Sequence, residues 1–248
     1  MTDRVKGASM MRLLCETLPQ CVPAKAGGHE PLRTGFDPSN IEASLGDWRI
    51  SFLWKTRKPH SAGSIWMVDP PPELVNHVAN LRHSKIIFRV EDFRALDVRA
   101  VISVAVDWAK VSNADIGFVH LFTDPDAVRG IKNGGFILGN RKGRDNSVMW
   151  STPRLKEYIP DLYWLMVFGP PYIDLFTRDR LLSAPAHEVR ELDSGHITIQ
   201  LTESYLDLET DYPRVAAVRD RVIEHLGPDA FFAEGRTEYR TPKFTFPR

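Results

Sequence analysis

One short stretch of this 248-residue chain carries side chains that could perform acid–base chemistry. His196, Thr198, Gln200 and Thr202 alternate along a predicted strand, and Glu203 follows them. Because imidazole titrates near neutral pH, a histidine beside a carboxylate could act as a general base. This pattern suggests a small hydrolase or a nucleic-acid-modifying enzyme. The intervening residues are apolar, however, and such alternation is also typical of an ordinary strand with one solvated face, which we favour.

A second candidate lies in the polar segment 140–146 (NRKGRDN). Its basic residues at 141–144, with Trp150 nearby, could hold a phosphate and stack on a base. A solvated basic loop explains the same residues. The balance of charge over the whole chain, with 32 Lys and Arg against 32 Asp and Glu, favours the loop and predicts no direct nucleic-acid partner.

The sequence lacks the motifs of the common catalytic sites. It contains no GxSxG nucleophile elbow, no GxxxxGK[ST] phosphate loop and no GxGxxG dinucleotide fingerprint. Gly134, Gly135 and Gly139 lack the strand-to-helix context of such motifs, so we interpret them as turn residues. The eight histidines never form HxH or HExxH. We therefore expect no enzyme activity, no cofactor and no metal site.

The charges are balanced globally but not locally. Between His187 and Pro213 the chain has seven acidic residues and one basic residue, Arg190. Part of this region, 203–212 (ESYLDLETDY), mixes carboxylates with tyrosines, a combination that suits a protein interface facing a basic partner. The predicted partner-binding residues are Glu203, Tyr205, Asp207, Glu209, Asp211 and Tyr212. A solvated acidic connector is the alternative.

Composition narrows the class of protein. Hydrophobic residues make up 43% of the chain, which excludes a disordered sequence. The only cysteines, Cys15 and Cys21, match neither a CxxC pair nor a zinc half-site, so we expect two reduced thiols. No apolar run approaches the roughly 18 residues that a membrane helix needs. We expect a cytoplasmic protein without membrane contact.

Hydrophobic periodicity predicts the elements that would position these groups. Strands are expected at 48–55, 65–68, 85–90, 116–122, 136–138 and 162–168, the last apolar on both faces and hence central. A hairpin is expected over 187–201 around Asp193-Ser194-Gly195. Helices are expected after Pro70–Pro72, over 97–111, in the segment TDPDAVRG, after Gly169-Pro170-Pro171, and on the face of Val215, Val218, Val222 and Leu226.

These elements lack a strict βαβ alternation. The pattern predicts an α+β fold in which a mixed, largely antiparallel sheet is covered by helices in a single domain. We place a loop-rich N-terminal arm at 1–46, in which a short helix could form at about 10–18, the domain at 47–234 and a C-terminal tail at 235–248.

Two strings in the second half of the chain carry a family likeness. LYWLMVFGPPYIDLFTRDRLLSAPAHEVRELDSGHITIQLTE is followed by VRDRVIEHLGPDAFF, and WRISFLWK adds a weaker echo. The two strings, over about residues 160–232, resemble immunity proteins of bacterial polymorphic-toxin and type VI secretion systems. The most similar group is encoded beside toxins of the restriction-endonuclease-like fold.

This resemblance implies a non-enzymatic antitoxin that binds a cognate toxin and masks its active site. A nuclease toxin carries a basic groove for phosphate, to which an acidic surface would be complementary. The likeness contains no binding motif, so the acidic candidates come from the local charge alone.

Overall fold

The computed structural model describes residues 3–46, 51–66, 83–132 and 152–245. The chain divides into two compact units, Met1–Asn113 (unit 1) and Ala114–Arg248 (unit 2). Each unit combines helices with one antiparallel sheet, so the predicted α+β class and antiparallel pairing are confirmed. The strands are shared between two sheets, of five and four strands, where the sequence pattern suggested one.

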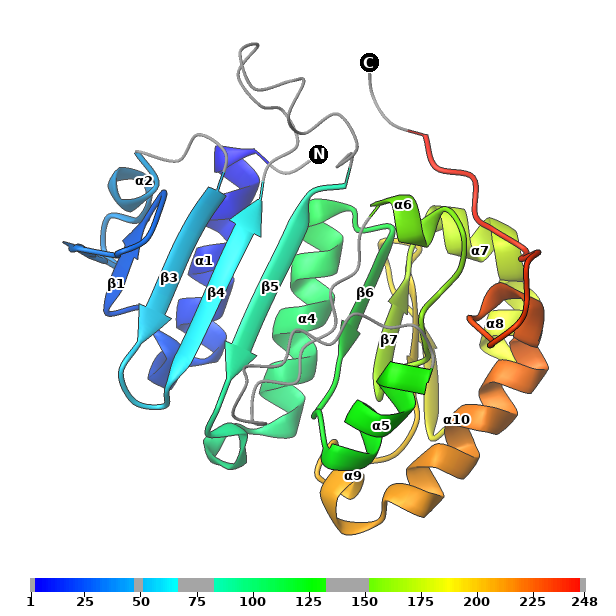
Figure 1. Cartoon of the computed structure of the whole chain (residues 1–248). Helices are drawn as coiled ribbons and strands as arrows, with labels where there is room; N and C mark the ends of the chain where they lie inside the picture. Colours follow the sequence, from blue (N-terminus) through cyan, green and yellow to red (C-terminus); the bar gives the residue numbers. More distant parts are fainter. Residues whose placement is uncertain (1–2, 47–50, 67–82, 133–151, 246–248) are drawn as a thin grey trace. The chain divides into compact units, whose positions relative to one another are not determined.

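Unit 1 has the sheet order β2-β1-β3-β4-β5. Its strands are β1 (Lys25–Gly27), β2 (Thr34–Gly35), β3 (Ser51–Thr56), β4 (Ser61–Trp66) and β5 (Lys85–Val90), and its helices are α1 (Arg4–Thr17), α2 (Ile41–Ser44) and α4 (Val98–Ser112), with 3-10 turns η1 (Pro19–Cys21) and η3 (Phe93–Ala95). The long helices α1 and α4 pack on each other and cover the same face of the sheet (Figure 1). The predicted helix over 97–111 is confirmed, and Asp97 caps it by accepting a hydrogen bond from the Ala100 amide.

The described residues 3–46 contribute to the core of unit 1, although composition suggested a loop-rich arm. Three apolar side chains of α1, those of Met10, Met11 and Leu14, are completely buried. The indole of Trp108, in α4, donates a hydrogen bond of 2.9 Å to the Met10 carbonyl. The sequence indicated only a short helix at about 10–18, because charged residues dilute the apolar positions of α1, and tertiary burial stabilises the longer helix.

An aromatic cluster fills the space between the sheet and the helices. Trp54 packs edge-on against Trp108 at 6.1 Å between ring centres and stacks near Phe52 and Phe88. Gly63, which pairs with Trp54 on the neighbouring strand, leaves room for this ring: a Cβ at Gly63 would lie 2.0 Å from the indole. The core therefore depends on a residue without a side chain at this position.

We expect Gly63→Ala to lower the free energy of unfolding by about 1–3 kcal/mol, because the buried indole of Trp54 must move to admit a methyl group. The measurement is urea unfolding followed by Trp fluorescence. Gly35→Ala is the matched control, because nothing lies within 4 Å of a Cβ at Gly35. Equal effects of the two substitutions would contradict the packing role.

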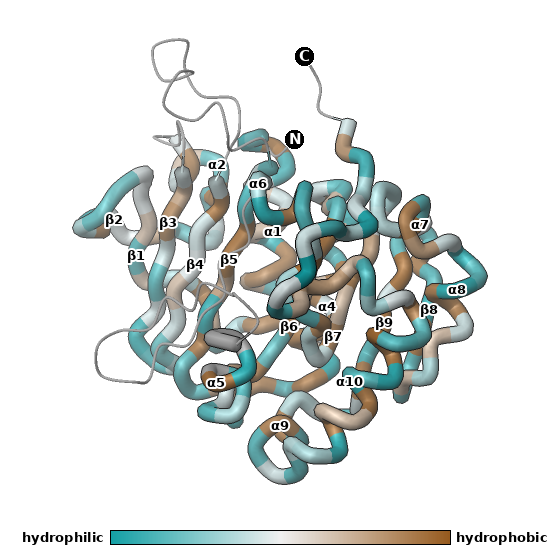
Figure 2. Tube along the Cα trace, turned by 45° about the vertical axis from the view of Figure 1, so that its right-hand side comes forward, coloured by the Kyte–Doolittle hydropathy of each residue, from teal (hydrophilic) through white to brown (hydrophobic). Residues whose placement is uncertain are grey.

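Unit 2 has the sheet order β6-β7-β9-β8. Its strands are β6 (Ile116–Val119), β7 (Leu165–Phe168), β8 (Glu188–Glu191) and β9 (Ile197–Gln200), and its helices are α5 (Asp124–Lys132), α6 (Thr152–Leu155), α7 (Pro170–Phe176), α8 (Arg178–Leu182), α9 (Asp207–Thr210) and α10 (Tyr212–Leu226), with the 3-10 turn η4 (Pro228–Ala230). As predicted, β7 is an interior strand whose residues are all buried, and it is coloured hydrophobic in Figure 2. The hairpin β8–β9 turns at Gly195 with φ 78°, which confirms the predicted glycine turn.

Gly169, at the start of the GPPY string, is required for a close approach of two backbones. A Cβ at Gly169 would lie 2.1 Å from the Ala114 carbonyl oxygen, and the Gly169 amide donates a hydrogen bond of 2.8 Å to the Asp115 carbonyl. This contact joins the end of β7 to the residues before β6. The glycine of the family-like string therefore has a packing function.

The segment 235–245 is fastened to unit 2, although the sequence suggested a tail. Arg240 donates hydrogen bonds to the Leu175 carbonyl near the end of α7 (2.8 Å) and to the Leu226 carbonyl at the end of α10 (2.7 Å). Its guanidinium also pairs with Asp229 at 3.1 Å. Carbonyls at helix C-termini lack partners within the helix, so a cation that binds two of them caps both helices.

Some predicted elements lie outside the described residues: the start of the 48–55 strand, the helix after Pro70–Pro72, the strand at 136–138, the basic loop at 140–146 and Trp150. Among the helices that the structure describes, none combines the length and apolar character needed to cross a membrane.

Candidate partner-binding site

The acidic stretch 203–212 lies in unit 2, between the end of β9 and the start of α10. It is anchored from within: the side-chain amide of Gln200 donates hydrogen bonds to the carbonyls of Thr202 (2.8 Å) and Glu203 (3.1 Å). The Ser204 hydroxyl accepts a hydrogen bond from the Leu206 amide. The backbone of the stretch is therefore held by several hydrogen bonds before any partner arrives.

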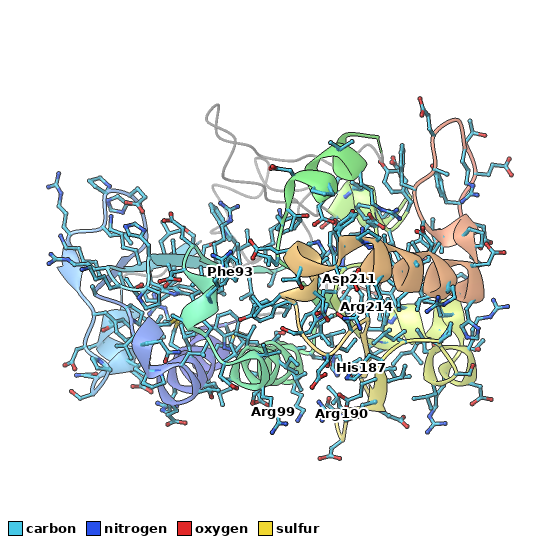
Figure 3. The ribbon with its side chains drawn as sticks, turned by 90° about the horizontal axis from the view of Figure 1, so that it is seen from below. Phe93, Arg99, His187, Arg190, Asp211 and Arg214 are labelled. Carbon is cyan, nitrogen blue, oxygen red and sulfur yellow. The ribbon has the colours of Figure 1, made fainter. Side chains whose placement is uncertain are left out.

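Two of the four predicted acidic contacts are paired with Arg214. Its guanidinium lies 2.9 Å from Asp207 and 3.2 Å from Asp211. Asp211 is also the N-cap of α10 and accepts a hydrogen bond from the Arg214 amide (3.4 Å). Asp211 and Arg214 lie together at the start of α10 in Figure 3. Asp211 therefore caps α10, and it shares one cation with Asp207, which reduces the local negative charge.

The two predicted tyrosine anchors have interior contacts. Tyr205 is only 4% exposed and packs edge-on against Trp164, with ring centres 5.5 Å apart. Tyr212 is partly buried, and its hydroxyl donates a hydrogen bond to Asp126 at 3.2 Å. Neither ring is arranged as a freely exposed anchor. Glu203, Glu209 and Asp211 are the exposed members of the predicted set.

Behind this stretch lies a buried network of charges centred on Arg219. This arginine of α10 is 1% exposed, and its guanidinium lies 3.2 Å from Asp126 and 3.8 Å from Asp161. Asp161 also receives two hydrogen bonds from Arg129, at 2.7 and 3.2 Å. Arg129 in turn reaches Asp220 at 3.2 Å. The network joins α5, the segment before β7 and α10.

The sequence contained a signal for this network that the predicted helix face missed. Val215, Arg219, Val222 and Leu226 follow one another at spacings of four, three and four, which places all of them on one side of a helix. All four are buried, whereas Val218, which we had assigned to the face, is only partly buried. An arginine is rarely buried without partners, and the partners of Arg219 are distant from it in the sequence.

His120 lies at the edge of the same network. Its Nδ1 accepts a hydrogen bond from the Trp164 amide (3.1 Å), which leaves the proton on Nε2, 3.1 Å from Asp126 but poorly aligned for a hydrogen bond. Burial lowers the pKa of His120, so the ring is neutral at pH 7. Burial alone would raise the pKa of Asp126, but the His120 contact, the charge of Arg219 and the Thr123 donors together hold that pKa below its usual range.

The His196 face is buried, which corrects the expectation of a solvated face. His196 is 1% exposed; one ring nitrogen lies 2.9 Å from the Ser194 hydroxyl and the other 3.0 Å from the Ala114 carbonyl. Thr198 donates a hydrogen bond to the Arg190 carbonyl. Because one ring nitrogen contacts the hairpin turn and the other contacts the Ala114 carbonyl before β6, the geometry does not favour His196 as a general base.

The structure describes no group that would hold a metal: within its residues, no three His, Cys, Asp or Glu side chains come together in a suitable cluster. Cys15 and Cys21 are unbonded thiols, and burial raises the pKa of both to about 11. The basic residues of 140–146 lie outside the described part of the chain.

Comparisons of the chain with protein-family models, with curated proteins and with solved structures found no match in any of the three. The resemblance to immunity proteins stays a prediction. Its residues, about 160–232, all lie within unit 2.

We expect Arg219→Met to lower the free energy of unfolding by about 3–5 kcal/mol, because it removes the arginine that balances the buried carboxylate of Asp126 and one of the two arginines beside Asp161. Chemical denaturation measures the change. Arg221→Met provides the control, since Arg221 is the exposed arginine two residues further along the same helix. A loss below about 1 kcal/mol for Arg219→Met would show that the network is not a major determinant of stability.

Acid should destabilise the protein through His120. Its pKa is lower in the folded chain than the value of about 6.5 in the unfolded chain, so stability is complete above pH 6.5 and falls as the pH drops below it, by at most about 1.4 kcal/mol per pH unit. Asp126, whose folded pKa is also lowered, adds a further loss below about pH 4.

The measurement is urea unfolding at a series of pH values between 7.5 and 5. His120→Asn should flatten the profile, because an amide oxygen can still accept the Trp164 hydrogen bond but does not titrate. His60→Asn, at an exposed position, should leave the profile unchanged. An unaltered slope in His120→Asn would refute the assignment.

Proposed function

We propose that this chain is an immunity protein that binds a cognate secreted toxin, a nuclease, and neutralises it by masking the active site. The observation that carries the proposal is the exposed carboxylate group of Glu203, Glu209 and Asp211 at the junction of β9, α9 and α10. A nuclease binds phosphates through cations in a groove, and a surface of fixed carboxylates is complementary to such a groove.

The rigidity of this junction supports the proposal. The hydrogen bonds of Gln200 and the cap of α10 hold the acidic residues before binding, and the Arg219 network fixes α10 from behind. Little conformational entropy is then lost when the complex forms, which favours high affinity. The family-like strings lie in the same unit, so the likeness and the carboxylates belong to one folded body.

The internal pairing of Asp207 and Asp211 sharpens the choice of residues to test. Reversing the charge of either would disturb the start of α10 as well as any interface, because both contact Arg214. Glu203 and Glu209 are exposed and do not cap the helix, so they report on binding more directly.

The first test is co-purification of the chain with the products of neighbouring genes, together with rescue of growth when a candidate toxin is expressed. We expect a stable complex and restored growth. If no neighbouring product forms a complex and none of the toxins is neutralised, the proposal is wrong.

The second test locates the interface. Glu203→Lys with Glu209→Lys should slow association with the toxin by about tenfold at low salt, because charge steering is lost. Glu234→Lys with Glu238→Lys, at exposed positions elsewhere in unit 2, makes the same change of charge and should have little effect. Association rates are measured by surface-immobilised binding at two salt concentrations. An affinity unchanged within about twofold in the first variant would leave this acidic surface without a role in binding.

A further inference from the structure

The sheet of unit 1 has one face that its long helices do not cover. In Figure 1, α1 and α4 lie behind the strands, and in Figure 3, seen from below, both lie on the same side. The residues on that side include Phe52, Trp54 and Ile65, which form the core. Since side chains alternate along a strand, the other residues of β3 and β4 point to the opposite face, which we call the open face because α1 and α4 do not cover it. Ala62 and Trp66 are exposed there, whereas Ser51 and Ser64 are buried.

The strand register arranges the open face in rows. One row crosses four strands through the paired residues Lys25, Lys55, Ala62 and Arg89, in β1, β3, β4 and β5. Neighbouring strands lie about 4.8 Å apart, so this row spans roughly 14 Å. It contains three cations and no acidic residue.

The next two rows add apolar and aromatic groups. The second row is Gly27, Leu53, Ser64 and Ile87, and the third is Ser51, Trp66 and Lys85. Trp66 is 42% exposed, and its indole nitrogen donates a hydrogen bond of 3.0 Å to the Ser64 hydroxyl. Since Ser64 is two residues away on the same strand, this bond draws the ring along the open face toward the second row. An apolar strip therefore lies between a cationic row and a row with an indole and a fourth cation.

Among the described residues of unit 1, only one carboxylate lies within ion-pair range of these cations. Glu30 lies 3.9 Å from Lys55, at the limit of an ion pair. In the part of the chain that the structure describes, Lys25, Lys85 and Arg89 form no ion pair. Burial lowers the pKa of Lys85, as expected for an ammonium without a carboxylate beside it. Like charges directly across two strands, as at Lys25 and Lys55, are destabilising.

We propose that this open face binds single-stranded nucleic acid. Cations in the first and third rows would contact backbone phosphates, and the indole of Trp66 with the apolar strip would stack against bases. An acidic protein segment would also meet the cations. The exposed indole, held over a flat sheet face, favours a ligand with flat aromatic groups between its charges.

This inference goes beyond the proposed function and concerns the other unit. It also differs from the expectation of no nucleic-acid partner, which rested on the balanced charge of the whole chain. That balance is a sum over separate surfaces, whereas phosphates respond to charges within about 10 Å. The open face can therefore be locally cationic in a neutral chain.

The test is fluorescence anisotropy of a labelled 15-nucleotide single strand, DNA and RNA, with the full chain at increasing salt. If the four cations each neutralise a phosphate, log K should fall with log salt with a slope of about −3, at about −0.7 per phosphate. Absence of binding at low salt would overturn the proposal.

Variants of the open face identify the site. Lys25→Glu with Arg89→Glu should weaken binding at least tenfold and reduce the slope by about 1.4, because two phosphate contacts are lost. Arg99→Glu with Lys110→Glu makes the same change of charge on α4, on the helix-covered side, and should change binding less than twofold; Arg99 is labelled in Figure 3. Equal losses in the two double variants would refute the assignment to the open face.

Variants of Trp66 test whether the ligand is a nucleic acid or another kind of anion. Trp66→Ala should weaken oligonucleotide binding about tenfold, and Trp66→Phe should retain most of it, because a ring still stacks. If Trp66→Ala binds as well as the parent chain, or if polyglutamate of equal length competes as strongly as the oligonucleotide, the ligand is an anion of another kind and the proposal fails. Circular dichroism confirms that each variant is folded. Toxin binding is measured on unit 2 residues, so failure here leaves the proposed function untouched.

Discussion

Moving the guanidinium of Arg219 out of water costs several kcal/mol unless carboxylates meet it at close range. In unit 2 those carboxylates, Asp126 and Asp161, come from segments that are far from α10 in the sequence. Each of them has further fixed partners, Tyr212 and Thr123 for Asp126 and Arg129 for Asp161. The positions of α5, the chain before β7 and the start of α10 are thus mutually determined by one charge.

Pairing between charges of the same unit also determines how much of the acidic stretch 203–212 forms an acidic surface. An acidic stretch that is counted along the sequence is not an acidic surface, because part of its charge meets arginines of the same fold. Arg214 engages Asp207 and Asp211, while Tyr212 is drawn toward the buried network. Glu203 follows the end of β9 and Glu209 lies within α9, and both are exposed. A local charge count overstates the surface, and the structure selects which carboxylates face solvent.

Elements whose local pattern agrees with their burial could be predicted from the sequence. The helix over 97–111, the interior strand ending at Phe168 and the turn at Gly195 all follow from periodicity, apolar content or a glycine with positive φ. Features that depend on distant partners could not. A polar strand face becomes interior when residues such as Ala114 supply hydrogen-bond partners for His196. Arg219 occupies an apolar helix position for the same reason. The predicted site included all four carboxylates, but the sequence could not show that Arg214 pairs with Asp207 and Asp211.

Arg240 binds the carbonyl ends of α7 and α10, and it follows every described helix and strand of unit 2 in the sequence. During synthesis, both helices will therefore emerge from the ribosome before the group that caps them. Domains generally fold in the order in which they are made. The contacts of unit 1 include its own first helix, so unit 1 can reach its native packing before Arg240 of unit 2 has been synthesised. A nascent chain paused before residue 240 would carry one finished unit and one with two helix ends unsatisfied.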